Sequence, residues 1–236
     1  MNNFNSEDQL VNFFAELLLN RNNFNRKSKI IMREVDCWQG RADIVEAAVE
    51  NIRPCFTEHQ LQLMSHYTCS YLISLLHHNS VRTREYLHNN SGVSIKTTDK
   101  WIQELRLANI FTELSTDRFV LGTSFLLPDI YFVAYEVKLH NWKRALYQAI
   151  QYKGFSNESY VVMPQNNISP AINNIEAFKA NNIGLIEVNN GGTYRVKLKP
   201  RSSRPRSKSY NIVGKGMAIR TFCSETITQK HLDEIQ

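Results

Sequence analysis

The stretch Tyr135-Glu136-Val137-Lys138 ends an apolar run, and the segment WKRALYQAIQY follows at residues 142–152. Side chains of an extended chain alternate between two faces, so Glu136 and Lys138 share one face of the predicted strand 130–139. Strands this apolar usually lie in the middle of a sheet, where an unpaired charge is costly. A buried carboxylate next to an ammonium group therefore needs a further partner, such as a divalent cation.

Residues 142–152 have the spacing of a helix that packs one side against a sheet. Two polar residues, Gln148 and Tyr152, lie one turn apart on the flank of this helix. That flank either faces the charged residues of the strand or is an ordinary polar edge. The packing stripe of the predicted helix consists of Trp142, Ala145, Leu146 and Ala149.

The N-terminal part of the chain predicts a helix and then a hairpin. Apolar residues have helical spacing from Ser6 to Leu19, with Ser6 as the N-cap. Strands are predicted at residues 29–37 and 41–49, joined by a turn at 38–40. The second strand carries Asp43 among apolar neighbours, where a carboxylate that does not face solvent needs a partner.

The middle of the chain has a helical pattern. Helices are predicted at residues 58–76, 82–88 and 98–108, followed by a short hairpin. A turn at residues 89–94 separates the second and third helices, as in helix-turn-helix units. This order resembles a winged helix, which serves as a DNA-binding module or as a protein-protein module. Residues 56–124 are therefore predicted to be an inserted domain.

The α/β pattern returns after this insertion, so residues 1–55 and 125–200 are predicted to form one discontinuous domain. From Pro200 to Lys208 a composition rich in Pro, Ser and Arg indicates an exposed or partly disordered segment. Residues 200–236 are predicted to be a basic C-terminal extension. The strands expected after the insertion lie at residues 130–139, 160–163, 183–188 and 194–198.

The composition limits the class of protein. With 236 residues and 42% apolar residues, the chain can form a sizeable core. The net charge is +6, and the segment from Thr193 to Arg220 has nine Lys/Arg and no Asp/Glu, which favours a polyanionic partner. The four cysteines lack the spacing of zinc ligands. Since the sequence has no long apolar run and no signal pattern, we expect a cytoplasmic protein without membrane contact.

Three motifs together, Arg41-Ala-Asp43-Ile-Val, Glu136-Val-Lys138 and Gln148-x-x-x-Tyr152, resemble the PD-(D/E)XK nuclease superfamily. The resemblance covers residues 6–53 and 129–190. It implies an α/β fold with a restriction-endonuclease-like αβββαβ core and a mixed sheet. The chain departs from the family pattern because Asp43 follows Arg-Ala and not Pro, and because of the predicted insertion. Such an insertion is compatible with the site when it leaves and re-enters at a sheet edge or loop.

The resemblance implies catalytic roles for Asp43, Glu136, Lys138 and Gln148. Hydrolysis of a phosphodiester needs a hard cation that neutralises developing oxyanions and lowers the pKa of the attacking water. Oxygen ligands suit Mg²⁺ or Mn²⁺, and by resemblance they are Asp43, Glu136 and the backbone carbonyl of Val137. By the same resemblance, Lys138 orients the water or helps to deprotonate it.

The superfamily often places a further Glu on the first helix. At about 100° per residue, Glu7 falls on the apolar face of this helix and Glu16 lies roughly opposite. Glu7 is therefore the candidate metal ligand, although a carboxylate near a helix N-terminus is favourable without any metal. Glu34 and Asp36 share a strand face and are alternative ligands.

Basic and polar residues outside this set are candidates for DNA contact. Arg41 can contact phosphate, although an arginine at a strand end is often simply solvated. By resemblance, Tyr152 supports the substrate or the catalytic residues. The candidates on the predicted recognition helix and in the C-terminal stretch are Lys96, Thr98, Lys100, Arg201, Arg204 and Arg206.

The sequence thus predicts a Mg²⁺-dependent deoxyribonuclease, in which the winged helix and the basic tail position DNA. A homodimer or a partner protein is expected for double-strand cutting, because each metal centre of this type cuts one strand. Two other interpretations stay open: a DNA-binding regulator or assembly subunit that keeps the fold without cleaving, and RNA as the substrate. The simplest reading of Glu136 and Lys138 is an exposed ion pair, which contributes little.

Overall fold

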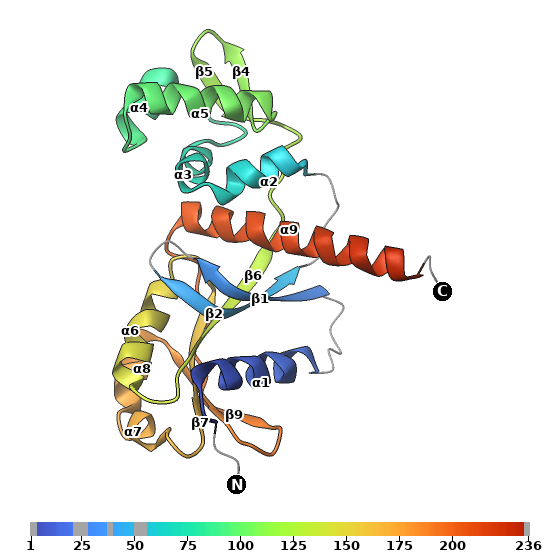
Figure 1. Cartoon of the computed structure of the whole chain (residues 1–236). Helices are drawn as coiled ribbons and strands as arrows, with labels where there is room; N and C mark the ends of the chain where they lie inside the picture. The colour runs from blue at the N-terminus through green and yellow to red at the C-terminus, as the bar shows by residue number, and fades with distance from the viewer. Residues whose placement is uncertain (1–3, 21–27, 37–39, 50–55, 234–236) are drawn as a thin grey trace. The chain divides into compact units, whose positions relative to one another are not determined.

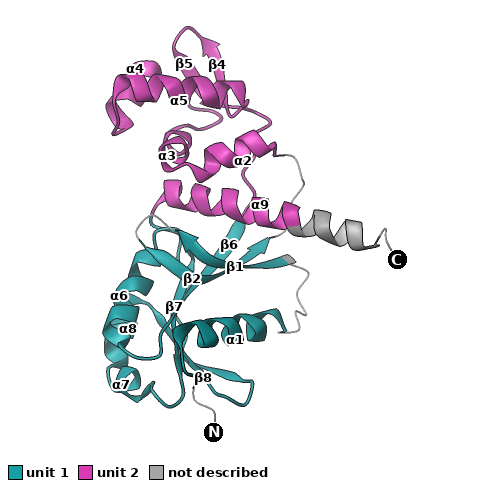
Figure 2. Cartoon of the chain, viewed as in Figure 1, with its two compact units in different colours: residues 1–50, 130–206 teal, residues 51–129, 207–236 magenta. Residues whose placement is uncertain are grey.

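The computed structural model describes residues 4–20, 28–36, 40–49 and 56–233. The chain divides into two compact units, one formed by residues 1–50 and 130–206 and the other by residues 51–129 and 207–236 (Figure 2). The chain therefore leaves the first unit after β2 and re-enters it at β6. No helix in the described part of the chain is long and apolar enough to cross a membrane.

The first unit is built on a six-stranded mixed sheet with the order β1-β2-β6-β7-β8-β9 (Figure 1). β6, β7 and β8 are parallel to one another, and the other neighbouring strands are antiparallel. The predicted α/β class with a mixed sheet is confirmed. The strands are β1 (Ser28–Asp36), β2 (Arg41–Val49), β6 (Ile130–Val137), β7 (Glu158–Pro164), β8 (Gly184–Val188) and β9 (Tyr194–Leu198).

Helices cover both faces of this sheet (Figure 1). The predicted N-cap of the first helix is confirmed, because the Ser6 hydroxyl accepts a hydrogen bond from the backbone of Gln9. This helix packs on one face, and the other three pack on the opposite face. The helices are α1 (Glu7–Leu19), α6 (Trp142–Tyr152), α7 (Ser169–Ile172) and α8 (Ile175–Asn181).

The alternation predicted for the central strand is confirmed in β6. Tyr135 and Val137 are buried in the core cluster that includes residues of α1. Glu136 points to the opposite side, where the Tyr152 hydroxyl of α6 meets it. The strand therefore buries a carboxylate in an otherwise apolar layer, on the side of the sheet that α6 covers.

The second unit contains five helices within the described residues and a three-stranded sheet with the order β3-β5-β4. The predicted single helix 58–76 is wrong: the helix breaks at His66, whose backbone is extended. The sequence has no Gly or Pro at the break that could have predicted it. The break allows both α2 and α3 to pack on α9. The elements are α2 (Glu58–Ser65), α3 (Tyr67–Leu75), β3 (Arg82–Thr83), α4 (Arg84–Asn90), α5 (Ile95–Leu107), β4 (Phe111–Ser115), β5 (Arg118–Leu121) and α9 (Lys208–Asp233).

The C-terminal part of the chain differs from the predicted basic extension. Residues from 207 onward belong to the second unit, where α9 forms much of the core with α2 and α3. The preceding residues are held against the first unit: the backbone of Arg201 donates to Asn182, and the backbone of Arg206 donates to Lys153. Residues 201–206 thus form a strap with fixed hydrogen bonds, in which Arg201, Arg204 and Arg206 are exposed. Of the two predicted alternatives, the structure shows exposure and not partial disorder.

Two cysteines, Cys69 and Cys223, are free thiols in the described residues. Burial raises the pKa of Cys69 to about 12, so this thiol stays protonated and unreactive at neutral pH. Cys37, Cys55 and most of the predicted turn at 38–40 lie outside the described residues.

Gly216 allows the close approach of α9 to α2, and its replacement tests this packing. A Cβ atom at this position would lie 2.8 Å from Cβ of Met64, which is closer than real Cβ contacts. We expect Gly216→Val to lower the free energy of unfolding by about 1–3 kcal/mol, measured by urea denaturation. Ser224→Val, at an exposed position of the same helix, is the control and should change it by less than about 0.5 kcal/mol. Equal effects of the two variants would contradict this account of the packing.

Candidate functional site

Asp43 and Glu136 come together because β2 and β6 are neighbours in the sheet. Ile44 pairs with Tyr135 in the antiparallel ladder, so Asp43 and Glu136 follow at the next position. The backbone N–H of Val137 donates a hydrogen bond of 2.7 Å to Oδ2 of Asp43. This bond fixes the Asp43 carboxylate at the end of β6, where the strand stops.

Glu136 is the most deeply buried charged group of the site, with a side chain that is 0% exposed. The Tyr152 hydroxyl is hydrogen bonded to Oε2 of Glu136 and also lies 3.0 Å from the Arg41 carbonyl oxygen. A hydroxyl carries one hydrogen, so Tyr152 can donate either to Oε2 of Glu136 or to the Arg41 carbonyl oxygen. The other oxygen, Oε1, is buried and has no hydrogen bond of good geometry, although Lys138 lies nearby.

The ammonium group of Lys138 links three structural elements. Its Nζ lies 2.9 Å from Oε1 of Glu136, 3.8 Å from Oδ2 of Asp43 and 3.1 Å from Oε2 of Glu7 at the start of α1. It also donates to the carbonyl oxygen of Val137 at 3.2 Å. The Lys138 side chain is only 13% exposed, so these contacts are largely shielded from water. Glu7 thus contacts the site through Lys138, and its predicted role as a metal ligand stays a prediction.

Burial dominates the electrostatics of the two carboxyl groups. It raises the pKa of Asp43, against the lowering effect of the Val137 hydrogen bond and of the Lys138 charge. It also raises the pKa of Glu136, and the negative charge of Asp43 raises it further. Both groups therefore resist ionisation, and an added positive charge at this site would stabilise their ionised forms.

Lys138 responds in the opposite sense to the same surroundings. Burial lowers its pKa, but the charge of Glu136, the hydrogen bond to it and the charge of Asp43 together outweigh burial and raise the pKa. The stabilisation from this interaction is fully present below the ordinary pKa of 10.5 and is lost as the pH rises through the raised value. Lys138 is thus a cation throughout the physiological range.

The donor set suits a hard divalent cation. Mg²⁺ is commonly held by one or two carboxylates and keeps several water ligands. Asp43, Glu136 and the Val137 carbonyl supply oxygen donors, and Oε1 of Glu136 is a buried oxygen that forms an ion pair of 2.9 Å with the Lys138 ammonium. Among the described residues, no group of three or more His, Cys, Asp and Glu side chains is arranged to hold a metal. A metal here would therefore rely on the two carboxylates, the carbonyl and water.

Two predicted DNA contacts are corrected by burial. Tyr152 is 0% exposed, and its hydroxyl serves Glu136 inside the first unit. Thr98 is also fully buried, and its hydroxyl bonds to Ser91 and to the carbonyl of Ser94, so it holds the turn before α5 together. Neither side chain is available to DNA in this structure. Helical periodicity in the sequence places both residues on helices. It does not show that other parts of the chain cover their side chains.

The other predicted contact residues lie at the surface. Lys100 places its ammonium 4.9 Å from the centroid of the Trp101 ring, and Arg41 lies 3.3 Å from Glu34 in an exposed ion pair. That pair occupies Glu34, one of the two alternative ligands. The exposed basic candidates are Arg41, Lys96, Lys100, Arg201, Arg204 and Arg206.

Gln148 lies on α6, as predicted, and is half-buried. Its Oε1 atom is buried and has no hydrogen-bond partner. An unpaired buried acceptor is costly, so this oxygen is a candidate to receive a donor from a ligand or water. The structure gives Gln148 no bond to the charged residues, and its catalytic role stays a prediction.

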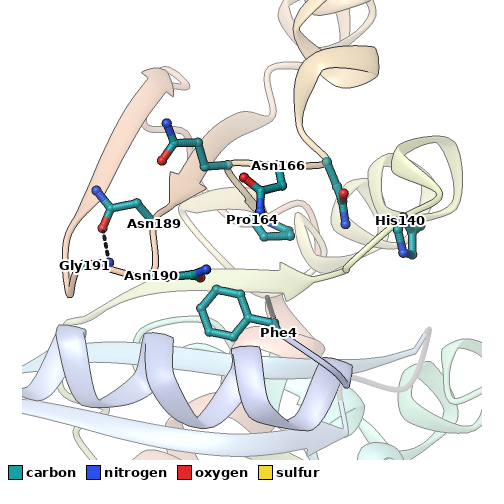
Figure 3. Close-up of a pocket in the computed structure, with 9 residues that line it drawn as sticks. Phe4, His140, Pro164, Asn166, Asn189, Asn190 and Gly191 are labelled. Atoms are coloured by element: carbon teal, nitrogen blue, oxygen red, sulfur yellow. Dashed lines mark hydrogen bonds between the residues drawn. The ribbon is translucent and has the colours of Figure 1, made fainter. Parts of the chain in front are cut away.

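A pocket that the sequence interpretation missed lies beyond the end of β6 (Figure 3). Its volume is about 450 Å³. The signal in the sequence was the pair of Asn-rich turns after two predicted strands, at residues 165–167 and 189–190. The residues around it are Phe4, His140, Pro164, Gln165, Asn166, Asn167, Asn189, Asn190 and Gly191.

Comparisons with protein-family models, with curated proteins and with solved structures find no match to this chain.

Replacing Lys138 tests the electrostatic account. Because the pKa values of Asp43 and Glu136 are raised, the folded chain binds more protons than the unfolded chain between the ordinary and the raised values. Stability therefore falls as the pH rises through that window. Lys138→Met removes the cation that limits this fall, so we expect a loss of about 3–5 kcal/mol at neutral pH and a smaller loss near pH 4. Urea denaturation at both pH values measures the difference.

The control for this experiment is Lys179→Met, which breaks an exposed pair with Glu176. Its effect should stay within about 0.5 kcal/mol at both pH values. A Lys138→Met penalty that does not depend on pH would show that the loss comes from packing and not from the carboxylates.

Divalent cations should stabilise the fold through the same carboxylates. We expect millimolar Mn²⁺ or Mg²⁺ to raise the melting temperature at pH 8, and to raise it less at pH 5, where protons compete for the carboxylates. Asp43→Asn and Glu136→Gln should each abolish the shift. Glu176→Gln is the control, because Glu176 is an exposed carboxylate on α8 that pairs with Lys179. A shift that survives in Asp43→Asn would place the metal elsewhere.

Proposed function

We propose that this chain is a metal-dependent nuclease that hydrolyses phosphodiester bonds in DNA, with a PD-(D/E)XK-like core in its first unit. The observation that carries the proposal is the convergence of three charged residues at one sheet edge. Nζ of Lys138 lies within 3.8 Å of both Asp43 and Glu136. Burying these charges on apolar strands is costly, and stability alone gives little reason to keep them.

Each residue of the set has a role in this proposal. The backbone of Val137 positions Asp43, and Tyr152 positions Glu136. A metal ion bound by these carboxylates and the Val137 carbonyl would supply Lewis acid chemistry and lower the pKa of a water molecule. Since the pKa of Lys138 is raised, this residue acts as a fixed positive charge that orients water and offsets transition-state charge.

The second unit supports a role in DNA positioning. Its elements follow the order α3-β3-α4-α5-β4-β5, with the sheet order β3-β5-β4, which fits a winged helix. In that arrangement α5 is the recognition helix, and it exposes Lys96 and Lys100. The arginines of the strap, Arg201, Arg204 and Arg206, add positive charge on the first unit for the phosphate backbone. Double-strand cutting would then use a homodimer or a partner protein.

A second function has one observation in its favour. The Lys138 ammonium contacts three carboxylates, and the described residues contain no metal-ready group of three such side chains. A protein that binds DNA without cutting it could use Lys138 simply as a structural cation. This alternative is a DNA-binding regulator or assembly subunit, and it differs from the nuclease in predicting no turnover.

Cleavage of supercoiled plasmid separates the two functions. We expect cutting with Mg²⁺ or Mn²⁺ and none with EDTA, and we expect Lys138→Ala and Asp43→Asn to lower the rate by at least about 100-fold. Glu176→Gln, which removes an exposed carboxylate on α8, is the control that should cut like the wild type. A parallel assay on RNA of the same sequence identifies the nucleic acid. Tight, salt-sensitive DNA binding without cutting would support the non-cleaving regulator instead.

A further inference from the structure

A pocket with an uncharged lining adjoins the charged site at the same edge of the sheet. It is formed by residues that follow three adjacent strands: His140 after β6, Pro164 to Asn167 around the end of β7, and Asn189 to Gly191 after β8. These strands are parallel, and the carboxyl ends of parallel strands are where α/β proteins bind ligands. His140 follows Lys138 by two residues, so the wall of the pocket lies within about 7 Å of the Lys138 backbone.

The chemistry of the lining selects the kind of ligand. The lining contains no Lys, Arg, Asp or Glu, and five of its nine residues are Asn or Gln. Carboxamides present a donor and an acceptor side by side, which is the pattern that pairs with the edge of a nucleobase. Phe4 faces the same space from the segment before α1, and Pro164 forms an apolar part of the wall (Figure 3). An aromatic ring beside amides suits a flat, uncharged, heteroaromatic group.

Two of the amides that line the pocket form hydrogen bonds that hold its loops. Asn189 accepts hydrogen bonds from the backbones of Gly191 and Thr193, and it donates to the Thr193 hydroxyl, so it holds the turn. Asn167 donates to the carbonyl of Leu139 and ties two loops together. Gln165, Asn166 and Asn190 also line the pocket, and their side chains are exposed, so a ligand in the pocket can reach them.

We infer that this pocket receives one unpaired nucleobase of the nucleic acid whose phosphate lies at the charged site. The inference rests on the proposed function, because it takes the adjoining site to hold a phosphodiester. The volume of about 450 Å³ is within the range of small-ligand sites. A base in a duplex is stacked and has its Watson–Crick edge occupied, so only an unpaired or extruded base can enter. The substrate class is therefore single-stranded nucleic acid, or a duplex in which the nucleotide beside the cut is unpaired or extruded.

The first test uses nucleosides, which lack the phosphate, in the presence of EDTA. We titrate isotope-labelled wild-type protein with deoxyadenosine, deoxyguanosine, deoxycytidine and thymidine, and with 2-deoxyribose as the control ligand. The side-chain amide signals of Gln165, Asn166 and Asn190 should shift with at least one nucleoside and not with the sugar. The double variant Gln165→Ala/Asn190→Ala should weaken that binding by roughly tenfold. Asn181→Ala, an exposed amide on α8 outside the pocket, should bind like the wild type.

This titration does not depend on cleavage, so it separates the two proposals. Nucleoside binding without any nuclease activity would support the assignment of the pocket to a base and overturn the proposal of a nuclease. Plasmid cutting without nucleoside binding, up to the solubility limit of the nucleosides, would support the proposal of a nuclease and overturn the assignment of the pocket to a base. Equal shifts with 2-deoxyribose, or unchanged binding in the double variant, would also overturn the base assignment. Melting temperatures of the variants confirm that each remains folded.

The second test uses single-stranded oligonucleotides with one abasic position, in DNA and RNA versions. If the pocket holds a base next to the cut, the wild type should cut more slowly at the phosphodiester beside the abasic position, by about tenfold, and normally elsewhere. The double variant Gln165→Ala/Asn190→Ala should cut both positions equally. Uniform cutting by the wild type would overturn the inference, and the two oligonucleotide types identify the sugar that accompanies the base.

Discussion

The contact of one ammonium group with three carboxylates organises the first unit. Lys138 lies at the end of β6, and its Nζ reaches Glu136 on the same strand, Asp43 on β2 and Glu7 on α1. These residues come from separate parts of the chain, so their charges meet only when the sheet and α1 are in place. Removing the Lys138 charge would leave Asp43 and Glu136 without their shared cation in a poorly hydrated site.

In the proposed function, the charged site and the amide-lined pocket would divide two tasks at the carboxyl ends of the parallel strands. Oxygen donors and a permanent cation are suited to the phosphate and its metal, since these groups bind and stabilise negative charge. The uncharged pocket is suited to a base, which is recognised by hydrogen bonds and stacking. The short link from Lys138 to His140 keeps the two regions within the reach of a single nucleotide. In this proposal, the fold arranges backbone chemistry and base recognition side by side.

The interruption of the first unit by the second follows from the architecture. The chain leaves after β2 and returns at β6, which are hydrogen-bonded neighbours in the sheet. An insertion at this point leaves the register of the ladder intact, so Asp43 and Glu136 stay adjacent. α9 completes the second unit from the far end of the sequence, and Gly216 permits its close contact with α2. The second unit is therefore discontinuous as well, which the sequence interpretation did not predict.

The sequence by itself determined the features that depend on local periodicity. The period of two in β6 placed Glu136 and Lys138 on one face, and helical spacing with the Ser6 cap defined α1. Tertiary structure decided the rest, because burial and pairing depend on residues far apart in the chain. Thr98 and Tyr152 have polar groups that bind inside the fold, and only packing shows that they are covered. The approach of Glu7 to Lys138 likewise requires α1 to lie against the sheet, which no local pattern specifies.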